Sequence, residues 1–276
     1  MIVRPVNIIY FGFDFFSFVL QELINDSRYN VIAVFTRNSE FSKSVCQISE
    51  TNNIPVFFDD FEPLHFESLI HDADVIISAS YDNLINTNSN VLTQINIHPS
   101  LLPECRGPSP IPWVLLDEPK SAGVTIHELT EELDKGDILI SEAIPNAEGL
   151  SYTEYSLKCN LLASQLVIRY LSDFLSFNEQ KVTQAGGSFK GYYPEKRRTI
   201  SQDMCGADII NLIDKVGFVG AVIDINEVKY SIFQASFYNK CFTEFESGFF
   251  ECNAFYLVFK CNDGVIVSPR NGYVIL

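Results

Sequence analysis

The chain has 276 residues, of which 47% are hydrophobic and 20% are charged, and its formal net charge is −16 at pH 7. This composition fits a folded globular protein and excludes an intrinsically disordered chain. The acidity argues against a general nucleic-acid binder, because phosphate contacts need Lys and Arg side chains. Residues 1–189 hold 10 Lys and Arg against 25 Asp and Glu, whereas residues 190–276 hold 9 against 10. The two regions are therefore expected to have different functions.

The seven cysteines and four histidines form no CxxC pair and no Cys–His spacing of the kind that binds zinc. We therefore expect free thiols in a reducing cytoplasm and no metal site. No run approaches ~18 apolar residues, and the N-terminal apolar run contains Asp14 and no small-residue cleavage site. Neither a membrane span nor a targeting segment is expected.

Short apolar runs alternate with helical segments over the first hundred residues. The runs that predict strands are Val6–Phe11, Val31–Thr36, Ile54–Phe58, Asp74–Ser78 and Ile95–His98. The segments between them with helical apolar spacing are Phe15–Ile24, Ser42–Thr51 and Phe66–His71. Strands rich in Val and Ile, separated by helices, indicate a parallel sheet that is covered on both faces. The sequence therefore predicts a doubly wound, mostly parallel α/β fold.

The turn after the first predicted strand reads GFDFFS and not GxGxxG, so the glycine-rich phosphate cradle is missing and a dinucleotide cofactor is not expected. No GxxxxGK[ST] run occurs either, which excludes a P-loop.

Prolines crowd residues 99–112 and predict a rigid, irregular loop. Strands are predicted at Gly123–Leu129 and Gly136–Ile140, followed by a long helix at Ser151–Phe174. The stretch AGGS at residues 185–188 predicts a linker between a first domain, residues 1–185, and a small β-rich domain, residues 190–276. The elements predicted for the second domain are a helix at Asp208–Val216 and strands at Ala221–Ile225, Val228–Phe233, Phe255–Lys260, Val265–Ser268 and Tyr273–Leu276.

Polar side chains follow the last parallel strand of the first domain. Asn96 and His98 are two residues apart, so on a strand their side chains share one face. Asp134 comes from a different loop, and ligands of open α/β sheets bind beyond the carboxyl ends of the strands. A His, an amide and a carboxylate that converge there suit an acyl-transfer site. Spacing alone leaves a structural, hydrogen-bonded role open for each of them, and we expect such a role for His127 within its strand.

The segments NIHPSLLPECRG and GVTIHELTEELDKGDIL resemble the folate-dependent N-formyltransferases, in which Asn-x-His, SLLP, RG and D-x-G-x-I follow in this order. The resemblance covers roughly the first 180 residues and, more loosely, a small β-rich C-terminal domain, where Val219 stands in place of a family proline. It implies that Asn96, His98 and Asp134 are catalytic. His98 would act as the base, Asn96 would stabilise the oxyanion, and Asp134 would orient His98 or a water.

The resemblance also implies a cosubstrate, N10-formyltetrahydrofolate, from which the formyl group passes to a primary amine without a metal. The residues that match the folate-binding segments of the family are Asn83, Leu84, Ile85, Thr130, Glu131, Glu132 and Leu133. Arg106 and Gly107 match its RG step and are implied to bind the substrate.

The acceptor amine separates the members of this family. Members that act on tRNA carry a basic insertion after the second strand, where this chain has only Arg37 and Lys43 against Glu40 and Glu50. A solvated linker or a diphosphate contact explains the basic cluster at residues 196–198 more simply than a tRNA groove does. Ribonucleotide transformylases are shorter and lack the β-rich domain.

A nucleotide-linked amino sugar is therefore the expected acceptor, with a dTDP-3-amino-3,6-dideoxyhexose favoured, in the cytoplasmic synthesis of surface polysaccharide such as the lipopolysaccharide O-antigen. Sugars with dTDP or UDP and a 4-amino group, and methionyl-tRNA, stay open as acceptors. A folate-dependent hydrolase and an inactive folate-binding protein stay open as other functions. We expect a homodimer, in which the apolar hairpins from Val219 onward serve dimerisation or substrate closure, and no nucleic-acid or membrane partner.

Overall fold

The computed structural model describes residues 4–58, 61–83, 85, 91–176, 180–239, 246 and 248–276. The chain divides into two compact units. The first unit comprises Met1–Gly107, Lys120–Pro145 and Ser156–Phe189, and the second comprises Pro108–Pro119, Asn146–Tyr155 and Lys190–Leu276. The second unit thus includes two segments that the predicted boundary places in the first domain.

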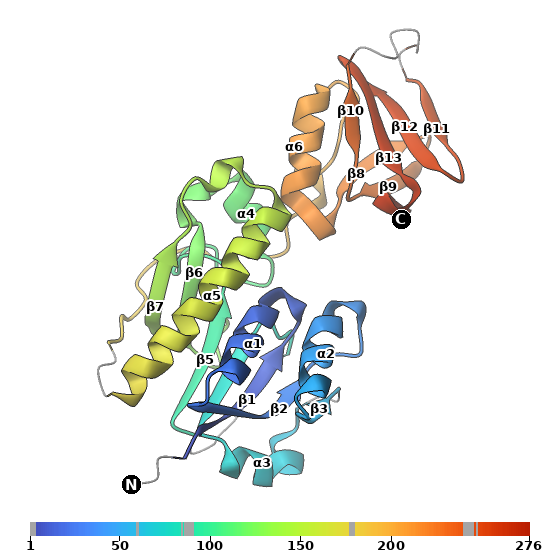
Figure 1. Ribbon diagram of the computed structural model, residues 1–276. Coiled ribbons are helices and arrows are strands. Elements are labelled where there is room, and N and C mark those ends of the chain that lie inside the picture. Colours follow the sequence, from blue (N-terminus) through green and yellow to red (C-terminus); the bar gives the residue numbers. More distant parts are fainter. Residues whose placement is uncertain are drawn as a thin grey trace. The chain divides into compact units, whose positions relative to one another are not determined.

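The first unit is built on a seven-stranded sheet with the order β3-β2-β1-β4-β5-β6-β7 (Figure 1). Strands β1 to β5 are parallel to one another, whereas β6 is antiparallel to β5 and to β7. The prediction of a doubly wound, mostly parallel sheet is confirmed. The strands are β1 (Val6–Gly12), β2 (Tyr29–Phe35), β3 (Val56–Phe57), β4 (Val75–Ala79), β5 (Thr93–His98), β6 (Gly123–Glu128) and β7 (Ile138–Ala143).

Helices cover the sheet, and its central strands β1 and β4 are therefore buried along nearly their whole length. The helices of this unit are α1 (Ser17–Asn25), α2 (Lys43–Thr51), α3 (Glu67–Asp72) and α5 (Tyr152–Leu175). Asn160 of α5 accepts a hydrogen bond from the backbone N–H of Phe18 at the start of α1, and Tyr170 of α5 contacts Thr93 of β5. The α3 side of the sheet is filled by a cluster that includes Phe11, Phe35, Phe61, Phe66 and Ile85.

The turn after β1 shows why no phosphate cradle forms there. A Cβ at Gly12 would lie 2.5 Å from the carbonyl oxygen of Ala79, so the close approach of the two strands requires glycine. The carboxylate of Asp14 accepts hydrogen bonds from the backbone N–H groups of Ser44 and Val45, at 3.1 and 2.9 Å. Asp14, from the turn after β1, therefore caps the N-terminal end of α2.

The proline-rich loop is shorter than predicted. Residues 110–116 form helix α4 (Pro110–Leu116), whereas an irregular segment is expected up to Pro112. Pro110 and Pro112 both lie in the first turn of this helix, where the missing N–H groups have no acceptor within the helix. The fixed φ of proline therefore favours the start of α4 instead of preventing it.

The second unit is β-rich, as the sequence predicts, and contains two antiparallel sheets in the orders β14-β9-β8 and β10-β13-β12-β11. Its core joins apolar residues of α6 (Gly206–Val216) to both sheets. Asn226 and Glu227 have φ values of 55° and 67°, as a two-residue hairpin turn requires. Two three-residue strands, β10 and β11, were not predicted. The strands are β8 (Ala221–Ile225), β9 (Val228–Ile232), β10 (Ser236–Tyr238), β11 (Phe250–Cys252), β12 (Tyr256–Cys261), β13 (Gly264–Pro269) and β14 (Tyr273–Ile275).

The basic cluster at residues 196–198 is not a solvated linker. Arg197 forms an ion pair with Asp117, and its guanidinium lies 5.3 Å from the centre of the Trp113 ring. The Lys190 ammonium lies 5.0 Å from the same ring, and Arg198 donates hydrogen bonds to two backbone carbonyls at 3.1 and 2.6 Å. Both arginines therefore hold the second unit together.

Three further predictions can be compared with the described residues. Cys46, Cys105, Cys159, Cys205, Cys252 and Cys261 are free thiols. Within the described ranges, no group of three or more His, Cys, Asp and Glu side chains is arranged to hold a metal ion. None of the described helices combines the length and the apolarity that crossing a membrane demands.

Candidate active site

Asn96 and His98 occupy the last half of β5, with Asn96 half-buried and His98 only 4% exposed. β5 pairs in parallel with β4 and antiparallel with β6, and Asn96 lies directly opposite His127 of β6. Directly opposed residues of an antiparallel pair project from the same face of the sheet. The register therefore brings His127 next to the two residues that the sequence selected.

Asp134 reaches the same place from the turn between β6 and β7. Its Oδ1 atom lies 3.5 Å from Nδ1 of His98 and 3.5 Å from Nε2 of His127. Its Oδ2 atom accepts a hydrogen bond of 2.8 Å from the backbone N–H of Gly107. The structure thus brings Asn96, His98 and Asp134 together, as the sequence predicts, and adds His127.

The hydrogen bonds of His127 fix the orientation of the Asn96 amide. Nδ1 of His127 lies 2.8 Å from the carbonyl oxygen of Glu128, which can only accept, so Nδ1 carries the proton. With the proton on Nδ1, Nε2 accepts from Nδ2 of Asn96 at 3.0 Å. The same Nδ2 donates to Oδ1 of Asp134 at 3.3 Å. Both amide hydrogens are used within the protein, and Oδ1 is the amide atom that remains for a substrate.

His98 is held as a neutral base. Its Nε2 donates to the carbonyl oxygen of Cys105 at 2.9 Å, so the unprotonated Nδ1 faces Asp134. Burial lowers the pKa of His98, an effect that the charge of Asp134 opposes. A proton taken up at Nδ1 would lie against the carboxylate, which would stabilise the imidazolium.

Asp134 stays ionised at neutral pH. Burial alone would raise the pKa of its carboxyl, but His98, His127 and the N–H of Gly107 lower that pKa to about 2. The carboxylate is only 4% exposed, so its charge acts on His98 with little screening by solvent.

Two residues at the edges of the segments predicted to bind folate share one apolar cluster. Ile85 is buried in the cluster that Leu129, the residue before Thr130, packs against. Thr130 donates to the carbonyl oxygen of Glu132 at 2.9 Å, and Glu132 forms an ion pair with Lys135. Asn83 is half-buried, Glu131 and Leu133 are exposed, and Leu84 lies outside the described residues.

The predicted substrate-binding pair lies at the edge of this site. Gly107 has φ = 121°, and its N–H is taken by Asp134. Arg106 donates from Nη2 to the carbonyl oxygen of Gly186 at 3.1 Å, while its Nε atom is buried and has no hydrogen-bond partner in the described part of the chain. Substrate binding by these two residues stays a prediction.

Two residues near the site escaped sequence reasoning. His127 was assigned a structural role within its strand, because the register of β5 against β6 cannot be seen in the sequence. Gln184 donates from Nε2 to the carbonyl oxygens of Asp134 and Gly136, at 2.9 and 2.7 Å. It stands next to the AGGS stretch, which was interpreted as a linker although Ser188 hydrogen-bonds to residues 103–106. A glutamine before a glycine pair gives no signal of such a contact.

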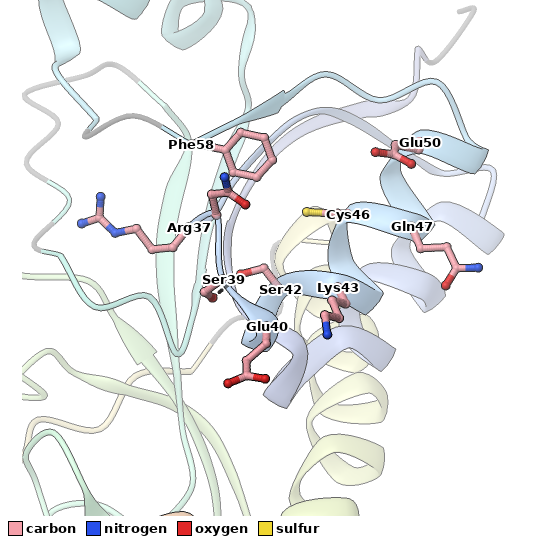
Figure 2. Close-up of a pocket in the computed structure, with 10 residues that line it drawn as sticks. Arg37, Ser39, Glu40, Ser42, Lys43, Cys46, Gln47, Glu50 and Phe58 are labelled. Atoms are coloured by element: carbon pink, nitrogen blue, oxygen red, sulfur yellow. Dashed lines mark hydrogen bonds between the residues drawn. The ribbon is translucent and has the colours of Figure 1, made fainter.

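A separate cavity of about 590 Å³ opens where β2 ends. It is lined by the segment after β2, the outer face of α2 and Phe58, and by none of the residues predicted for the site. Figure 2 shows the Cys46 sulfur turned toward the side of the cavity on which Arg37 and Phe58 lie. Arg37 pairs with Asp82 at 3.3 Å, so part of the positive charge here is neutralised within the protein.

Comparisons with known proteins identify the family and the fold of the chain. A family model described as formyl transferase matches residues 3–171. The methionyl-tRNA formyltransferase of Streptococcus uberis is 32% identical over 184 residues, which are 62% of this chain and 59% of that protein. The chain therefore matches about three fifths of that relative's length.

Two solved structures establish the fold. HypX from Aquifex aeolicus, in complex with tetrahydrofolic acid, aligns with a TM-score of 0.69 at 17% identity and covers 95% of this chain and 43% of that one. The N-formyltransferase from Helicobacter canadensis, in complex with folinic acid and dTDP-3-aminofucose, aligns with a TM-score of 0.64 at 16% identity. That match covers 96% of this chain and 98% of the other.

Proposed function

Because the chain belongs to the formyl transferase family, we propose that it transfers a formyl group from N10-formyltetrahydrofolate to the amine of a nucleotide-linked amino sugar. The observation that carries the proposal is the buried cluster of Asn96, His98 and Asp134 at the end of β5. These side chains supply an acceptor, a base and a fixed negative charge within hydrogen-bonding reach of one another, which is what acyl transfer to an amine requires.

Each side chain has a distinct task in this chemistry. The folate cosubstrate supplies the activated formyl group. The amine loses a proton as its nitrogen forms a bond to the formyl carbon, and Nδ1 of His98 takes that proton with Asp134 stabilising the charged ring. As the bond between the formyl carbon and N10 breaks, the same proton passes to N10, so tetrahydrofolate leaves as a neutral amine. Oδ1 of Asn96 accepts a hydrogen bond from the amine and directs its lone pair. The oxyanion role that the family resemblance gives to Asn96 would require its amide to release one of its two partners in the protein.

The folate would lie against the adjoining segments 83–85 and 130–133. Ile85 and Leu129, which belong to one apolar cluster, would form an apolar wall, and the backbone of residues 130–133 would hydrogen-bond a pterin ring. Arg106 would meet an anionic group of the acceptor at the loop after β5, because its Nε atom has no hydrogen-bond partner among the described residues.

The surface after β2 favours a sugar acceptor over tRNA. β2 ends at Phe35 and α2 begins at Lys43, so the connection is short, and Arg37 within it is paired with Asp82. A tRNA groove would need several free cations here. The likeness in length and fold to the Helicobacter canadensis enzyme supports a dTDP-linked 3-amino sugar.

Methionyl-tRNA is the second candidate acceptor. The 32% identity to the Streptococcus uberis protein favours it, although that match leaves out about two fifths of the relative. A 4-amino sugar linked to dTDP or UDP is a variant of the first candidate.

A panel of acceptors tests the proposal. The full chain would be incubated with N10-formyltetrahydrofolate and, separately, with dTDP- and UDP-linked 3-amino and 4-amino sugars and with charged initiator tRNA. Mass spectrometry would detect the formylated product. We expect turnover of a dTDP-linked amino sugar, and formylation of the tRNA alone would refute the proposed acceptor.

The proposed cellular setting is the cytoplasmic supply of formylated sugar to surface polysaccharide such as the O-antigen, with the enzyme acting as a homodimer. Val228, Val274 and Ile275 are exposed on the sheet β14-β9-β8 and would form the contact between two copies. Sedimentation of the full chain is expected to give a dimer and that of Ile275→Lys a monomer. A monomeric wild-type chain would end the dimer proposal.

A further inference from the structure

The segment that follows α5 contacts the loop after β5 and the turn that carries Asp134, which lie on the two sides of the candidate site. We call residues 182–189 the post-helix segment. At its start, Val182 and Ile138 exchange two backbone hydrogen bonds of 2.9 Å each. At its end, the N–H of Ser188 donates to Pro103 at 3.1 Å, and the N–H of Arg106 donates to Ser188 at 3.0 Å. The segment is therefore fixed at both ends to the two sides of the site.

Gln184 holds the turn that presents Asp134. Asp134 has φ = 55°, a left-handed backbone conformation that residues other than glycine adopt infrequently. A Cβ at Gly136 would lie 1.9 Å from the carbonyl oxygen of Glu128, so the turn is also packed tightly against β6. The Gln184 amide donates to the carbonyls on both sides of this turn, which fixes the direction of the Asp134 side chain.

Ser188 holds the loop that fixes His98. Its Oγ atom accepts a hydrogen bond of 3.0 Å from the backbone N–H of Cys105, whose own carbonyl accepts from His98. Cys105 also has a left-handed φ of 55°. A Cβ at Gly187 would lie 2.2 Å from the carbonyl oxygen of Pro103, so only glycine allows the segment to approach the loop this closely.

We propose that Gln184 is a positioning residue that sets the distance between His98 and Asp134 by holding the turn of Asp134. Ser188 holds the loop that fixes His98. This inference rests on the catalytic roles proposed above for His98 and Asp134. The Oδ1–Nδ1 separation of 3.5 Å is near the limit of a hydrogen bond, so a small displacement of Asp134 removes the contact.

Stability alone does not explain the glutamine. Its Oε1 atom is buried and has no hydrogen-bond partner within the ranges that the structure describes, and burying an unpaired acceptor costs free energy of folding. The gain from the glutamine therefore lies in the two hydrogen bonds that its Nε2 atom donates to the turn.

The variant Gln184→Met tests the inference, because methionine keeps the length and volume but cannot donate. Gln180→Met, at an exposed position shortly before the segment, is the matched control. The four histidines can be titrated separately by NMR in the free enzyme. We expect the pKa of His98 to fall in Gln184→Met, because Asp134 moves away, and the exposed His71 to be unchanged.

Kinetics gives the second readout. The kcat of Gln184→Met should fall about 10- to 100-fold, as a misplaced catalytic group predicts, while KM for both substrates stays within about threefold. Ser188→Ala should give a smaller loss of kcat, and Gln180→Met none. Wild-type kcat together with an unchanged His98 titration in Gln184→Met would overturn the inference.

A variant that does not fold and a wild-type chain without activity are the two remaining outcomes of the experiment. If Gln184→Met does not fold, Gln184→Asn replaces it, because an amide shortened by one methylene cannot reach both carbonyls, and the same titration of His98 applies. If the wild-type chain formylates no acceptor, the proposed function fails. The NMR titration still decides whether Gln184 controls the pairing of His98 with Asp134.

Discussion

The sheet of the first unit carries polar side chains at the carboxyl ends of two of its strands, β5 and β2, and the two places differ in how those side chains are held. At β5, His98 and Asp134 are each 4% exposed, and they come from the end of the strand and from the turn between β6 and β7. His98 and His127 both face Oδ1 of Asp134. At β2, Arg37, Lys43 and their neighbours come from one connection and one helix and line an open cavity (Figure 2). Burial and convergence fix the geometry of the first group, whereas the second group faces solvent. Chemistry is therefore expected at β5, and the largest mutational effects should fall there.

The largest effect is expected from His98→Asn, which removes the base. Loss of a general base lowers the rate by about 100- to 10,000-fold, and kcat of formyl transfer should fall within this range. The melting temperature, measured by calorimetry, serves as the control for folding. A variant with normal turnover would show that the cluster at β5 is not the site.

The pH dependence of stability should distinguish the buried carboxylate of Asp134. Its folded pKa of about 2 lies below its usual value of 3.8, so its contribution to stability is complete above pH ~4 and is lost as the pH falls toward about 2. Asp134→Asn should therefore be less stable by roughly 2 kcal/mol at neutral pH, and the difference should vanish at low pH. Urea unfolding across this pH range measures it, and a pH-independent difference would contradict the assignment.

A smaller loss is expected from His127→Leu, which removes the acceptor that orients the Asn96 amide. With one amide hydrogen released, Asn96 can rotate, and kcat should fall about tenfold. His71→Leu is the control, because its side chain is 87% exposed and lies outside the site. If the two variants have equal rates, His127 has only the structural role that the sequence suggested.

The smallest effect is expected at the cavity. Arg37→Ala and Lys43→Ala should change kcat and KM for a sugar acceptor by less than about twofold, and stability by less than about 1 kcal/mol, because exposed ion pairs contribute little. Steady-state kinetics with both acceptor classes is the measurement. If tRNA is formylated and loses affinity in these variants, the cavity lies on a tRNA-binding surface and the sugar proposal is wrong.

The sequence predicts those parts of the fold and of the site that depend on residues close together in the chain. The alternation of Asn96 and His98 on one strand is local, and the predicted strands and helices of the sheet agree closely with the structure. Asp134 was selected as the carboxylate of the site, but its contact with His98 could not be derived, because no spacing rule connects a turn to a strand 36 residues earlier. The pairing of Asn96 with His127 depends on the register of β5 and β6, which tertiary packing sets.

The segments that sequence reasoning misjudged share one cause. Glycines at residues 186–187 predicted a linker, and the boundary between the two units follows at Phe189, but Gly187 is also needed for a close approach to Pro103. Prolines suggested a loop, but Pro110 and Pro112 start a helix. In both places the residue type was interpreted by its usual preference, whereas its position relative to a neighbouring backbone decided the outcome.

Trp113, which lies between Lys190 and Arg197, gives the second unit an optical reporter of its own. The chain has a single tryptophan, so its intrinsic emission comes from one known place. The two cations on its ring, Lys190 and Arg197, belong to the part of the chain that begins immediately after the post-helix segment. Emission intensity during acid or urea titration would therefore follow the opening of this contact, and stopped-flow mixing would time it without any added dye.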